Sequence, residues 1–179
     1  MSAFDNLIGK RRPLGIGITP EVFRKDFLPL PESKELVGYS TNPRNAYGDW
    51  YEDLVEMRLK KICGRRNWKF QRSVNLGPSI VYRTKKVVDI LINGELGLEL
   101  KFLKGSGSLV QPKSIVDALD FTNRHVYCLY LVDGPGWLKS QNVEYLSRWW
   151  DFTCLKHLET TVDSYFRQGL ASSSAETRI

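Results

Sequence analysis

A helical pattern of apolar positions runs from Tyr47 to Cys63. Apolar side chains recur there three or four positions apart, which predicts an amphipathic helix. Gly64 follows at once, and glycine is a residue type at which helices commonly end. The apolar positions of this predicted helix are Trp50, Leu54, Val55, Leu59 and Ile62.

Three segments that favour strands follow the helix. They are Trp68–Val74, Lys85–Ile92 and Leu96–Leu103, and the last two are rich in Val, Ile and Leu. The pair Asn93-Gly94 between the last two predicts that they form a β-hairpin.

A second helix and a fourth strand complete the central pattern. Pro112 suits the first position of a helix, and the apolar residues after it share one face. A buried strand is expected from His125 to Val132. The order of helix, three strands, helix and strand predicts an α/β fold.

The flanks of this centre are less regular. Thr19 is the expected cap of one short helix that begins at Pro20, and Asn142 is the expected cap of a longer helical region. The chain is thus predicted to divide into a basic N-terminal arm with a short helix (1–43), a core (44–133), a C-terminal helical region (134–168) and a disordered tail (169–179).

Charged residues interrupt the two strands of the predicted hairpin. Side chains alternate between the faces of a strand, so Glu99 and Lys101 lie on one face while the apolar Leu98, Leu100 and Phe102 lie on the other. Asp89 interrupts the apolar run from Val87 to Ile92, where burial of a lone carboxylate costs several kcal/mol. A divalent metal ion would compensate such a charge.

The loop of the hairpin decides whether these charges meet. A two-residue turn at Asn93-Gly94 would pair Asp89 with Leu98 and send Glu99 to the far face. A three-residue loop pairs Asp89 with Gly97 and leaves Glu99 diagonal to Asp89 on the same face. We predict the loop of odd length.

These residue types suit hydrolysis of a phosphodiester bond. Mg²⁺ prefers oxygen ligands and keeps several waters, so two carboxylates and the scissile phosphate would hold it and leave a water to attack. Lys101 would orient that water and stabilise charge on the phosphate.

Composition limits the other function classes. The formal charge of +6 and the pI near 9.2 favour a polyanionic partner. The three cysteines, Cys63, Cys128 and Cys154, form no CxxC pair, so we expect neither a zinc site nor a disulfide framework. No apolar run has the length of a membrane span and no signal-peptide stretch opens the chain, so a cytoplasmic protein without membrane association is expected.

Asp89, nine intervening residues and then Glu99-Leu100-Lys101 resemble the signature of the PD-(D/E)xK nuclease superfamily, to which most type II restriction endonucleases belong. The resemblance implies a restriction endonuclease-like core, a mixed central sheet flanked by helices, over about half of the chain. Gly48-Asp49-Trp50-Tyr51-Glu52 is similar to the Gly-x-x-x-Glu segment on the first helix of many members, which implies that Glu52 joins the metal site, with Glu56 as the alternative. The sequence departs from the family signature at Val88, where the signature has proline.

The resemblance implies a Mg²⁺-dependent DNA endonuclease, in which Mn²⁺ can substitute for Mg²⁺ and no small-molecule cofactor takes part. A type II restriction endonuclease acting as a homodimer is the first hypothesis, because a two-fold pair of sites cuts both strands. A structure-specific nuclease, such as a Holliday junction resolvase or a phage or mobile-element nuclease, is the second. A DNA-binding module without catalytic activity is the third.

The remaining candidates have structural explanations as well. His125 and His157 have no evident partners at ligand spacing, and Trp149-Trp150 suits a core or a subunit interface. Several polar and basic residues are candidate DNA contacts, although charge runs are often only solvated surface. These candidates are Lys10, Arg11, Arg12, Arg65, Arg66, Lys85, Lys86, Lys104 and Gln111.

Overall fold

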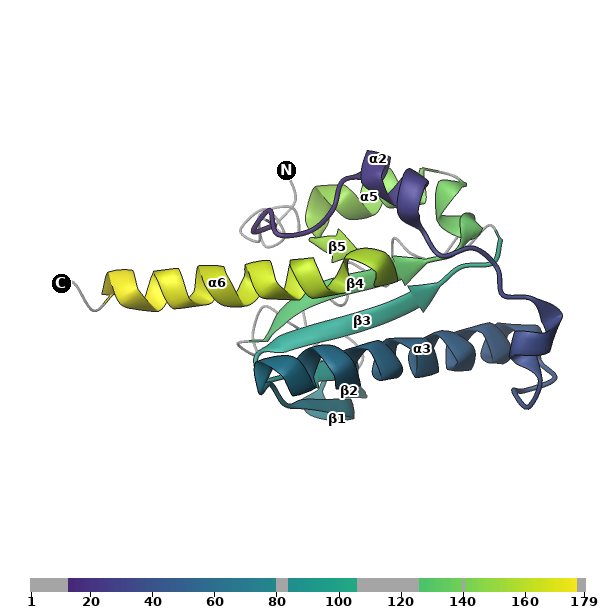
Figure 1. Ribbon diagram of the computed structural model, residues 1–179, viewed down its shortest axis with the longest axis horizontal. Coiled ribbons are helices and arrows are strands. Elements are labelled where there is room, and N and C mark those ends of the chain that lie inside the picture. Colours follow the sequence, from purple (N-terminus) through teal and green to yellow (C-terminus); the bar gives the residue numbers. More distant parts are fainter. Residues whose placement is uncertain (1–12, 80–83, 106–125, 140, 177–179) are drawn as a thin grey trace.

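The structure is a computed structural model that describes residues 13–79, 84–105, 126–139 and 141–176. It contains a mixed sheet of five strands with helices on both faces (Figure 1). In chain order the described helices, 3-10 helices (η) and strands are α2 (Pro20–Asp26), η1 (Ser33–Leu36), α3 (Pro43–Arg66), β1 (Phe70–Pro78), β2 (Lys85–Ile92), β3 (Leu96–Phe102), β4 (Tyr127–Asp133), η2 (Pro135–Leu138), α5 (Asn142–Trp149), β5 (Phe152–Thr153), η3 (Leu155–His157) and α6 (Leu158–Glu176).

The strands lie side by side in the order in which they occur in the sequence. Strands β1, β2 and β3 form an antiparallel meander, and β4 then pairs parallel to β3 along its whole length. The short strand β5 extends the sheet by pairing parallel to β4. The predicted α/β class is confirmed, and so are the predicted hairpin and the strand after it.

One face of the sheet is covered by α3 and α6. Helix α3 runs along β3 (Figure 1), and its buried residues Val55, Leu59 and Ile62 pack with alternate residues of the strands, such as Leu98 and Leu129. This is the helical spacing of apolar residues expected from the sequence. The first residues of α6 complete this layer.

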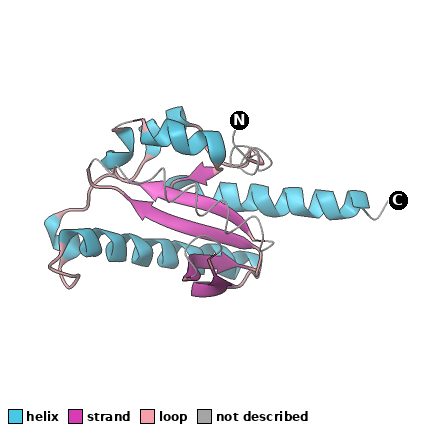
Figure 2. Cartoon of the chain, turned by 180° about the vertical axis from the view of Figure 1, so that it is seen from behind, coloured by secondary structure: helices cyan, strands magenta, loops and turns pink. Residues whose placement is uncertain are grey.

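The other face is covered by α2 and α5, which lie together on the far side of the sheet from α3 (Figure 2). Phe23 of α2 is fully buried there with Trp137 of η2 and Leu146 of α5. Thr19 caps α2 as predicted, because its hydroxyl accepts a hydrogen bond of 3.2 Å from the Val22 N–H. The N-terminal and C-terminal flanks therefore supply one helical layer of the core.

The end of α3 differs from its prediction. The helix continues through Gly64 to Arg66, and Asn67 follows with a left-handed φ of 57°. The Trp68 N–H then donates to the Cys63 carbonyl over 2.9 Å, which satisfies an end group of the helix. Asparagine tolerates this conformation, so Asn67 provides the helix end that was assigned to Gly64.

The C-terminal helical region is interrupted, contrary to the expectation of one long region. Helix α5 ends at Trp149, β5 joins the sheet, and α6 begins only at Leu158. Gln141, with a φ of 53°, is the cap of α5, and Asn142 is its first residue. Helix α6 continues to Glu176, past residue 169, where the tail was expected to begin. The predicted helix that opens at Pro112 lies outside the described residues.

A buried carboxylate joins three distant segments at the end of β4. Asp133 is fully buried, and its Oδ1 accepts a hydrogen bond of 2.6 Å from the Leu28 N–H after α2. Its Oδ2 accepts from the Tyr51 hydroxyl of α3 over 2.7 Å and from the Leu155 N–H over 2.9 Å. One side chain thus fixes the N-terminal flank, α3 and the C-terminal flank to the sheet.

All three cysteines are buried and none forms a disulfide. Among the described residues, no helix combines the length and the apolar character that crossing a membrane requires.

Asp133 should make the stability of the fold depend on pH. Burial raises its pKa to about 6 from 3.8, so the folded state binds this proton more tightly than the unfolded state does. The resulting contribution is complete below pH 3.8 and is lost as pH rises through 6. We therefore expect the stability advantage of the native protein over Asp133→Asn to shrink by roughly 3 kcal/mol between pH 3.5 and 7, measured by urea unfolding.

The milder variant Tyr51→Phe removes one of the three hydrogen bonds and should cost about 1 kcal/mol. An advantage over Asp133→Asn that stays constant with pH would contradict the expected titration of Asp133.

Candidate functional site

The hairpin of β2 and β3 sets the geometry of the predicted site. Its last paired residues are Ile92 and Leu96, so the loop has three residues, 93–95, as predicted. Asn93 and Gly94 both have a left-handed φ, of 50° and 72°, and the Glu95 N–H closes the turn on the Ile92 carbonyl over 3.1 Å.

The register of the hairpin differs from its prediction in one respect. The paired residues are Ile92 with Leu96, Leu91 with Gly97 and Ile90 with Leu98. The next residues beyond the last pair are Asp89 of β2 and Glu99 of β3, and neither is among the paired residues of this hairpin. The predicted partner, Gly97, faces Leu91 instead, because the loop lies one residue later in the chain than expected.

Asp89 lies at the level of the sheet where its own strand, β2, and the neighbouring β1 change the helical layer that their apolar side chains face. Val88 packs in the cluster of α2 and α5, whereas Ile90 packs in the cluster of α3 and α6. Strand β1 makes the same exchange between Phe70 and Val74, on either side of Ser73 with its φ of 50°. Asp89 is therefore at the boundary between the two layers.

The carboxylate of Asp89 lies in the seam between its own strand and β3. Its Oδ2 accepts a hydrogen bond of 2.8 Å from the backbone N–H of Leu100, just beyond the last ladder pair, Ile90 with Leu98. The Leu100 N–H thus donates to a side-chain carboxylate and not to a backbone carbonyl of β2. The Asp89 side chain is half-buried at this position.

Leu98 and Leu100 of β3 pack in the cluster of α3 and α6, so the alternation of side chains along the strand places Glu99 and Lys101 on the opposite face. The Glu99 side chain is only 2% exposed, and the Lys86 ammonium approaches its Oε1 to 3.6 Å from β2. Lys101 is half-buried, and its backbone carbonyl accepts a hydrogen bond of 3.2 Å from Trp137 Nε1.

Glu52 reaches the same region from α3. Burial raises its pKa, and the negative charge of Asp89 raises it further, so the two carboxylates lie close enough to interact. Arg72 of β1 opposes this effect through a contact of 3.0 Å between its Nη2 and Glu52 Oε2. Glu56, the alternative candidate, forms an ion pair with the same guanidinium and with Lys60.

The possible metal ligands in this region are carboxylate oxygens, which are hard ligands of the kind that Mg²⁺ prefers. Within the described parts of the chain, however, no three His, Cys, Asp or Glu side chains converge as a metal site. Of the predicted carboxylate set, Glu52 and Asp89 interact electrostatically, and Glu99 lies on β3, on the face away from Leu98 and Leu100.

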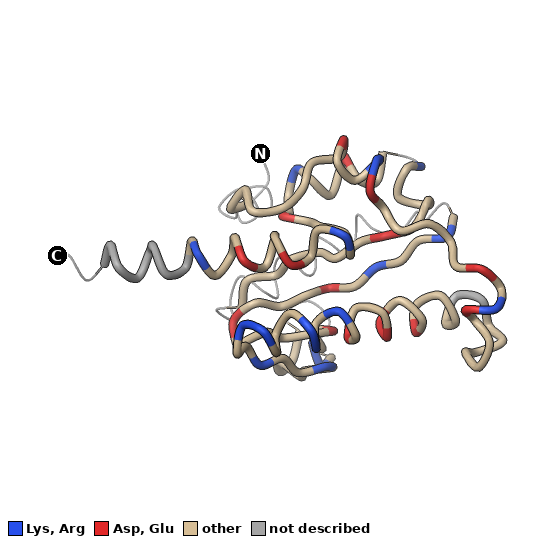
Figure 3. Tube along the Cα trace, viewed as in Figure 1, with Lys and Arg blue, Asp and Glu red and all other residues tan. Residues whose placement is uncertain are grey.

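Sequence reasoning missed Arg72 as a site residue and the ion pair of Lys86 with Glu99. Arg72 is a single cation on an edge strand, and only the packing of β1 beside α3 brings it to three carboxylates, those of Glu52, Asp53 and Glu56. Figure 3 shows acidic residues along the middle of α3 and basic residues toward its C-terminal end.

The candidate DNA contacts differ in whether they are engaged in ion pairs or exposed. Arg65 and Arg66 form ion pairs with Glu159 of α6, and Lys86 is turned inward to Glu99. Exposed positions are held by Lys85 and by Lys104, whose ammonium lies 5.2 Å from the centre of the Tyr47 ring. Lys10, Arg11, Arg12 and Gln111 lie outside the described residues, as does His125.

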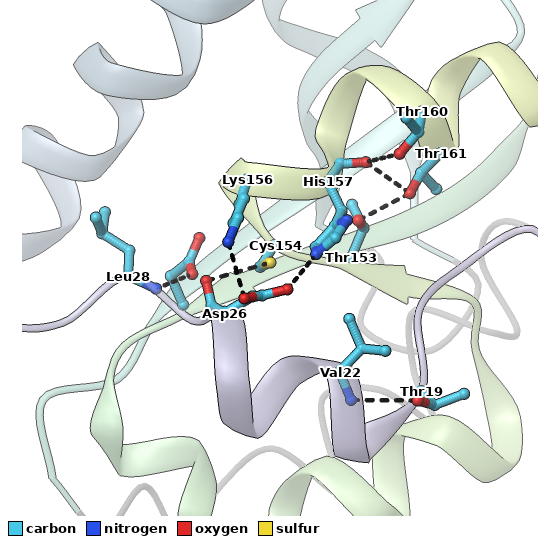
Figure 4. Close-up of polar contacts among 11 residues, drawn as sticks. Thr19, Val22, Asp26, Leu28, Thr153, Cys154, Lys156, His157, Thr160 and Thr161 are labelled. Carbon is cyan, nitrogen blue, oxygen red and sulfur yellow. Dashed lines mark hydrogen bonds and ion pairs between the residues drawn. The ribbon is translucent and has the colours of Figure 1, made fainter.

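His157 has a partner that sequence spacing did not indicate. Figure 4 shows Asp26 at the end of α2 between His157 and Lys156, at 2.7 Å from the imidazole Nε2 and 2.9 Å from the ammonium. Both hydrogen bonds lower the pKa of Asp26. Cys154 lies beside them, but burial raises the pKa of its thiol to about 11, so it is no thiolate nucleophile at neutral pH.

The tryptophan pair takes the structural role considered for it. Trp150 is buried, and its ring centre lies 5.0 Å from that of Tyr130 on β4. Trp149 packs partly buried against the same cluster.

Loss of the Lys86 ammonium should destabilise the fold. Lys86→Met leaves the Glu99 carboxylate buried without its cation, which we expect to cost about 2 kcal/mol at neutral pH. Lys85→Met, at the exposed neighbouring position, is the matched control and should change stability by less than about 0.5 kcal/mol. Equal effects of the two substitutions in urea unfolding would contradict the structural role of the Lys86–Glu99 pair.

No protein-family model, curated protein or solved structure matches the chain.

Proposed function

We propose that the protein is a Mg²⁺-dependent DNA endonuclease of the PD-(D/E)xK type. The observation that carries the proposal is the end of the β2–β3 ladder at Ile90 and Leu98, beyond which Asp89 and Glu99 are the next residues of the two strands and Asp89 Oδ2 accepts a hydrogen bond from the Leu100 N–H. Lys101 follows Glu99 on the same face, and Glu52 interacts electrostatically with Asp89 from α3.

The topology supports the proposal. Helix α3 is followed by three antiparallel strands, and β4 lies parallel to the third of them. A helix, three strands and a further strand in this order belong to the core that the superfamily resemblance implies between residues 44 and 133, and the helix that it implies before the last strand lies outside the described residues. The proposal therefore includes a restriction endonuclease-like core.

Each residue has a defined task in the proposed reaction. Asp89 and Glu99 would hold the cation together with the scissile phosphate, and Glu52 would complete the carboxylate set from α3. When bound, Mg²⁺ supplies electrophilic activation of the phosphate and a lowered pKa for an attacking water. The hydrogen bond from the Leu100 N–H to Asp89 Oδ2 fixes one oxygen and leaves Oδ1 for this task.

Lys101 would act on the nucleophile and on the transition state. Its ammonium, on the same strand face as Glu99, would orient the attacking water by hydrogen bonding. It would also stabilise the negative charge that develops on the phosphate. Mn²⁺ would substitute for Mg²⁺, because it accepts similar oxygen ligands.

DNA is the proposed substrate because of the charge of the chain. A net charge of +6 and a pI near 9.2 favour a polyanion, and Lys85 and Lys104 are exposed. A homodimer, which would cut both strands of a duplex, belongs to the type II restriction hypothesis.

A structure-specific nuclease is a second candidate, and one observation favours it. The flanks of the chain form a helical layer of the core through Phe23, Trp137 and Leu146. Long flanks would favour a restriction endonuclease if they supplied segments that read the DNA sequence, but in this chain they contribute to the core.

A cleavage assay tests the proposal. Supercoiled plasmid, a four-way DNA junction and single-stranded RNA are incubated with Mg²⁺, Mn²⁺ or EDTA. We expect cleavage of DNA that EDTA abolishes. Discrete plasmid fragments indicate restriction, and cleavage confined to the junction indicates resolution.

Asp89→Asn should lower the cleavage rate at least 1000-fold, because it removes a charged ligand of the proposed site. DNA binding, measured by fluorescence anisotropy, should change less than about threefold. Glu21→Gln, an acid-to-amide change at an exposed position of α2, is the control and should cut as the native protein does. Full activity of Asp89→Asn, or no cutting of any substrate by the native protein, would refute the proposal.

A further inference from the structure

We propose that Arg72 is the internal counter-ion of the candidate metal site, and that a divalent cation and Arg72 compete for the carboxylate of Glu52. The inference rests on the proposed function, since it assumes that Glu52 contributes to a cation site. It adds a residue of β1 that the PD-(D/E)xK signature does not contain.

The contacts of Arg72 carry the first step. Its Nη2 lies 3.0 Å from Glu52 Oε2, and its Nη1 forms a close ion pair with Glu56 Oε2. The two nitrogens of one guanidinium thus hold two carboxylates that are one helical turn apart. Asp53 is more distant, at 3.8 Å from Nη1.

The place of Arg72 in the sheet carries the second step. Arg72 pairs with Ile90, the residue next to Asp89. Ser73 then interrupts the regular pairing with a φ of 50°, and Val74 turns to the other helical layer. Arg72 is therefore held on the α3 side of the seam, beside the carboxylates that the cation would need.

The charges around Glu52 carry the third step. Asp89 and Asp49 raise the pKa of Glu52, and Arg72 lowers it. Without a cation, the guanidinium is the group that compensates Glu52 among these neighbours. A bound cation would repel a guanidinium that shares the same carboxylate.

The ion pair with Glu56 makes an exchange feasible. When Glu52 turns to a cation, Arg72 keeps Glu56 as its partner and is not left uncompensated. The two carboxylates therefore have different tasks, with Glu52 exchangeable and Glu56 permanent.

The competing explanation is that the ion pairs of Arg72 with Glu52 and Glu56 only stabilise the packing of β1 against α3. A purely structural role predicts only a loss of stability when Arg72 is replaced. Competition predicts in addition that the affinity for a cation rises, because a positive charge has left the site.

Calorimetric titration of the full chain with MgCl₂, without DNA, separates the two explanations. We expect Arg72→Gln to bind Mg²⁺ roughly tenfold more tightly than the native protein. Arg72→Lys keeps the charge and should stay within about threefold of the native affinity. An unchanged or weaker affinity in folded Arg72→Gln would overturn the inference.

A charge-matched pair provides the test if Arg72→Gln does not fold. Glu56→Gln and Asp53→Asn each remove one negative charge of α3, but only Glu56→Gln removes the permanent partner of Arg72. Arg72 would then depend on Glu52, and Mg²⁺ affinity should fall at least threefold further than in Asp53→Asn. Equal affinities in the two variants would overturn the inference.

Mg²⁺ binding and DNA cleavage by the native protein separate a failure of the proposed function from a failure of the role of Arg72. If it neither binds Mg²⁺ nor cleaves DNA, the proposed function fails and the competition at Glu52 fails with it. If it binds and cleaves but the Arg72 and Glu56 variants match their controls, only the role of Arg72 is refuted.

Discussion

The register of the β2–β3 hairpin is the constraint on which the arrangement of this molecule depends. A three-residue loop pairs Ile92 with Leu96, and this directs the apolar side chains of β3 to α3 and α6. A slip of one residue would invert every side chain of the strand, because the side-chain period is two. The same slip would bring Glu99 to the apolar layer and separate it from Lys86. Core and candidate site are thus fixed by one turn.

Buried carboxylates have two different uses in this fold. Asp133 joins the N-terminal flank, α3 and the start of η3, and Asp151 accepts hydrogen bonds of 2.8 and 3.1 Å from the Leu14 and Gly15 N–H groups. In these two cases backbone donors meet the carboxylate, which makes its burial tolerable. Glu99 instead has a lysine beside it. The first use connects chain segments, and the second keeps a charge next to the seam between β2 and β3.

The seam shows why the candidate site lies at Asp89. Strands β1 and β2 exchange their helical layers at this level of the sheet, so side chains from either layer can approach one point. Glu52 and Arg72 approach from the α3 side, and Glu99 with Lys86 belongs to the hairpin. An arrangement in which cations already compensate the carboxylates is stable without a metal ion. In the proposed metal site, the charge balance would thus determine cation affinity together with the ligands.

The sequence by itself determined the local elements: a helix over 47–63, although not its end at Arg66, the strand Lys85–Ile92, the strand from Leu96 to within one residue of its end, the Thr19 cap and the odd length of the hairpin loop. These follow from side-chain periodicity and turn chemistry, which act over a few residues. Only the tertiary structure decided the partner of Asp89, the break at β5 that divides the C-terminal helices, and the meeting of Arg72 with Glu52. These depend on contacts between segments far apart in the chain, and neither composition nor spacing encodes them locally. The parallel pairing of β4 with β3 is of the same kind, since the chain between them determines it only through packing.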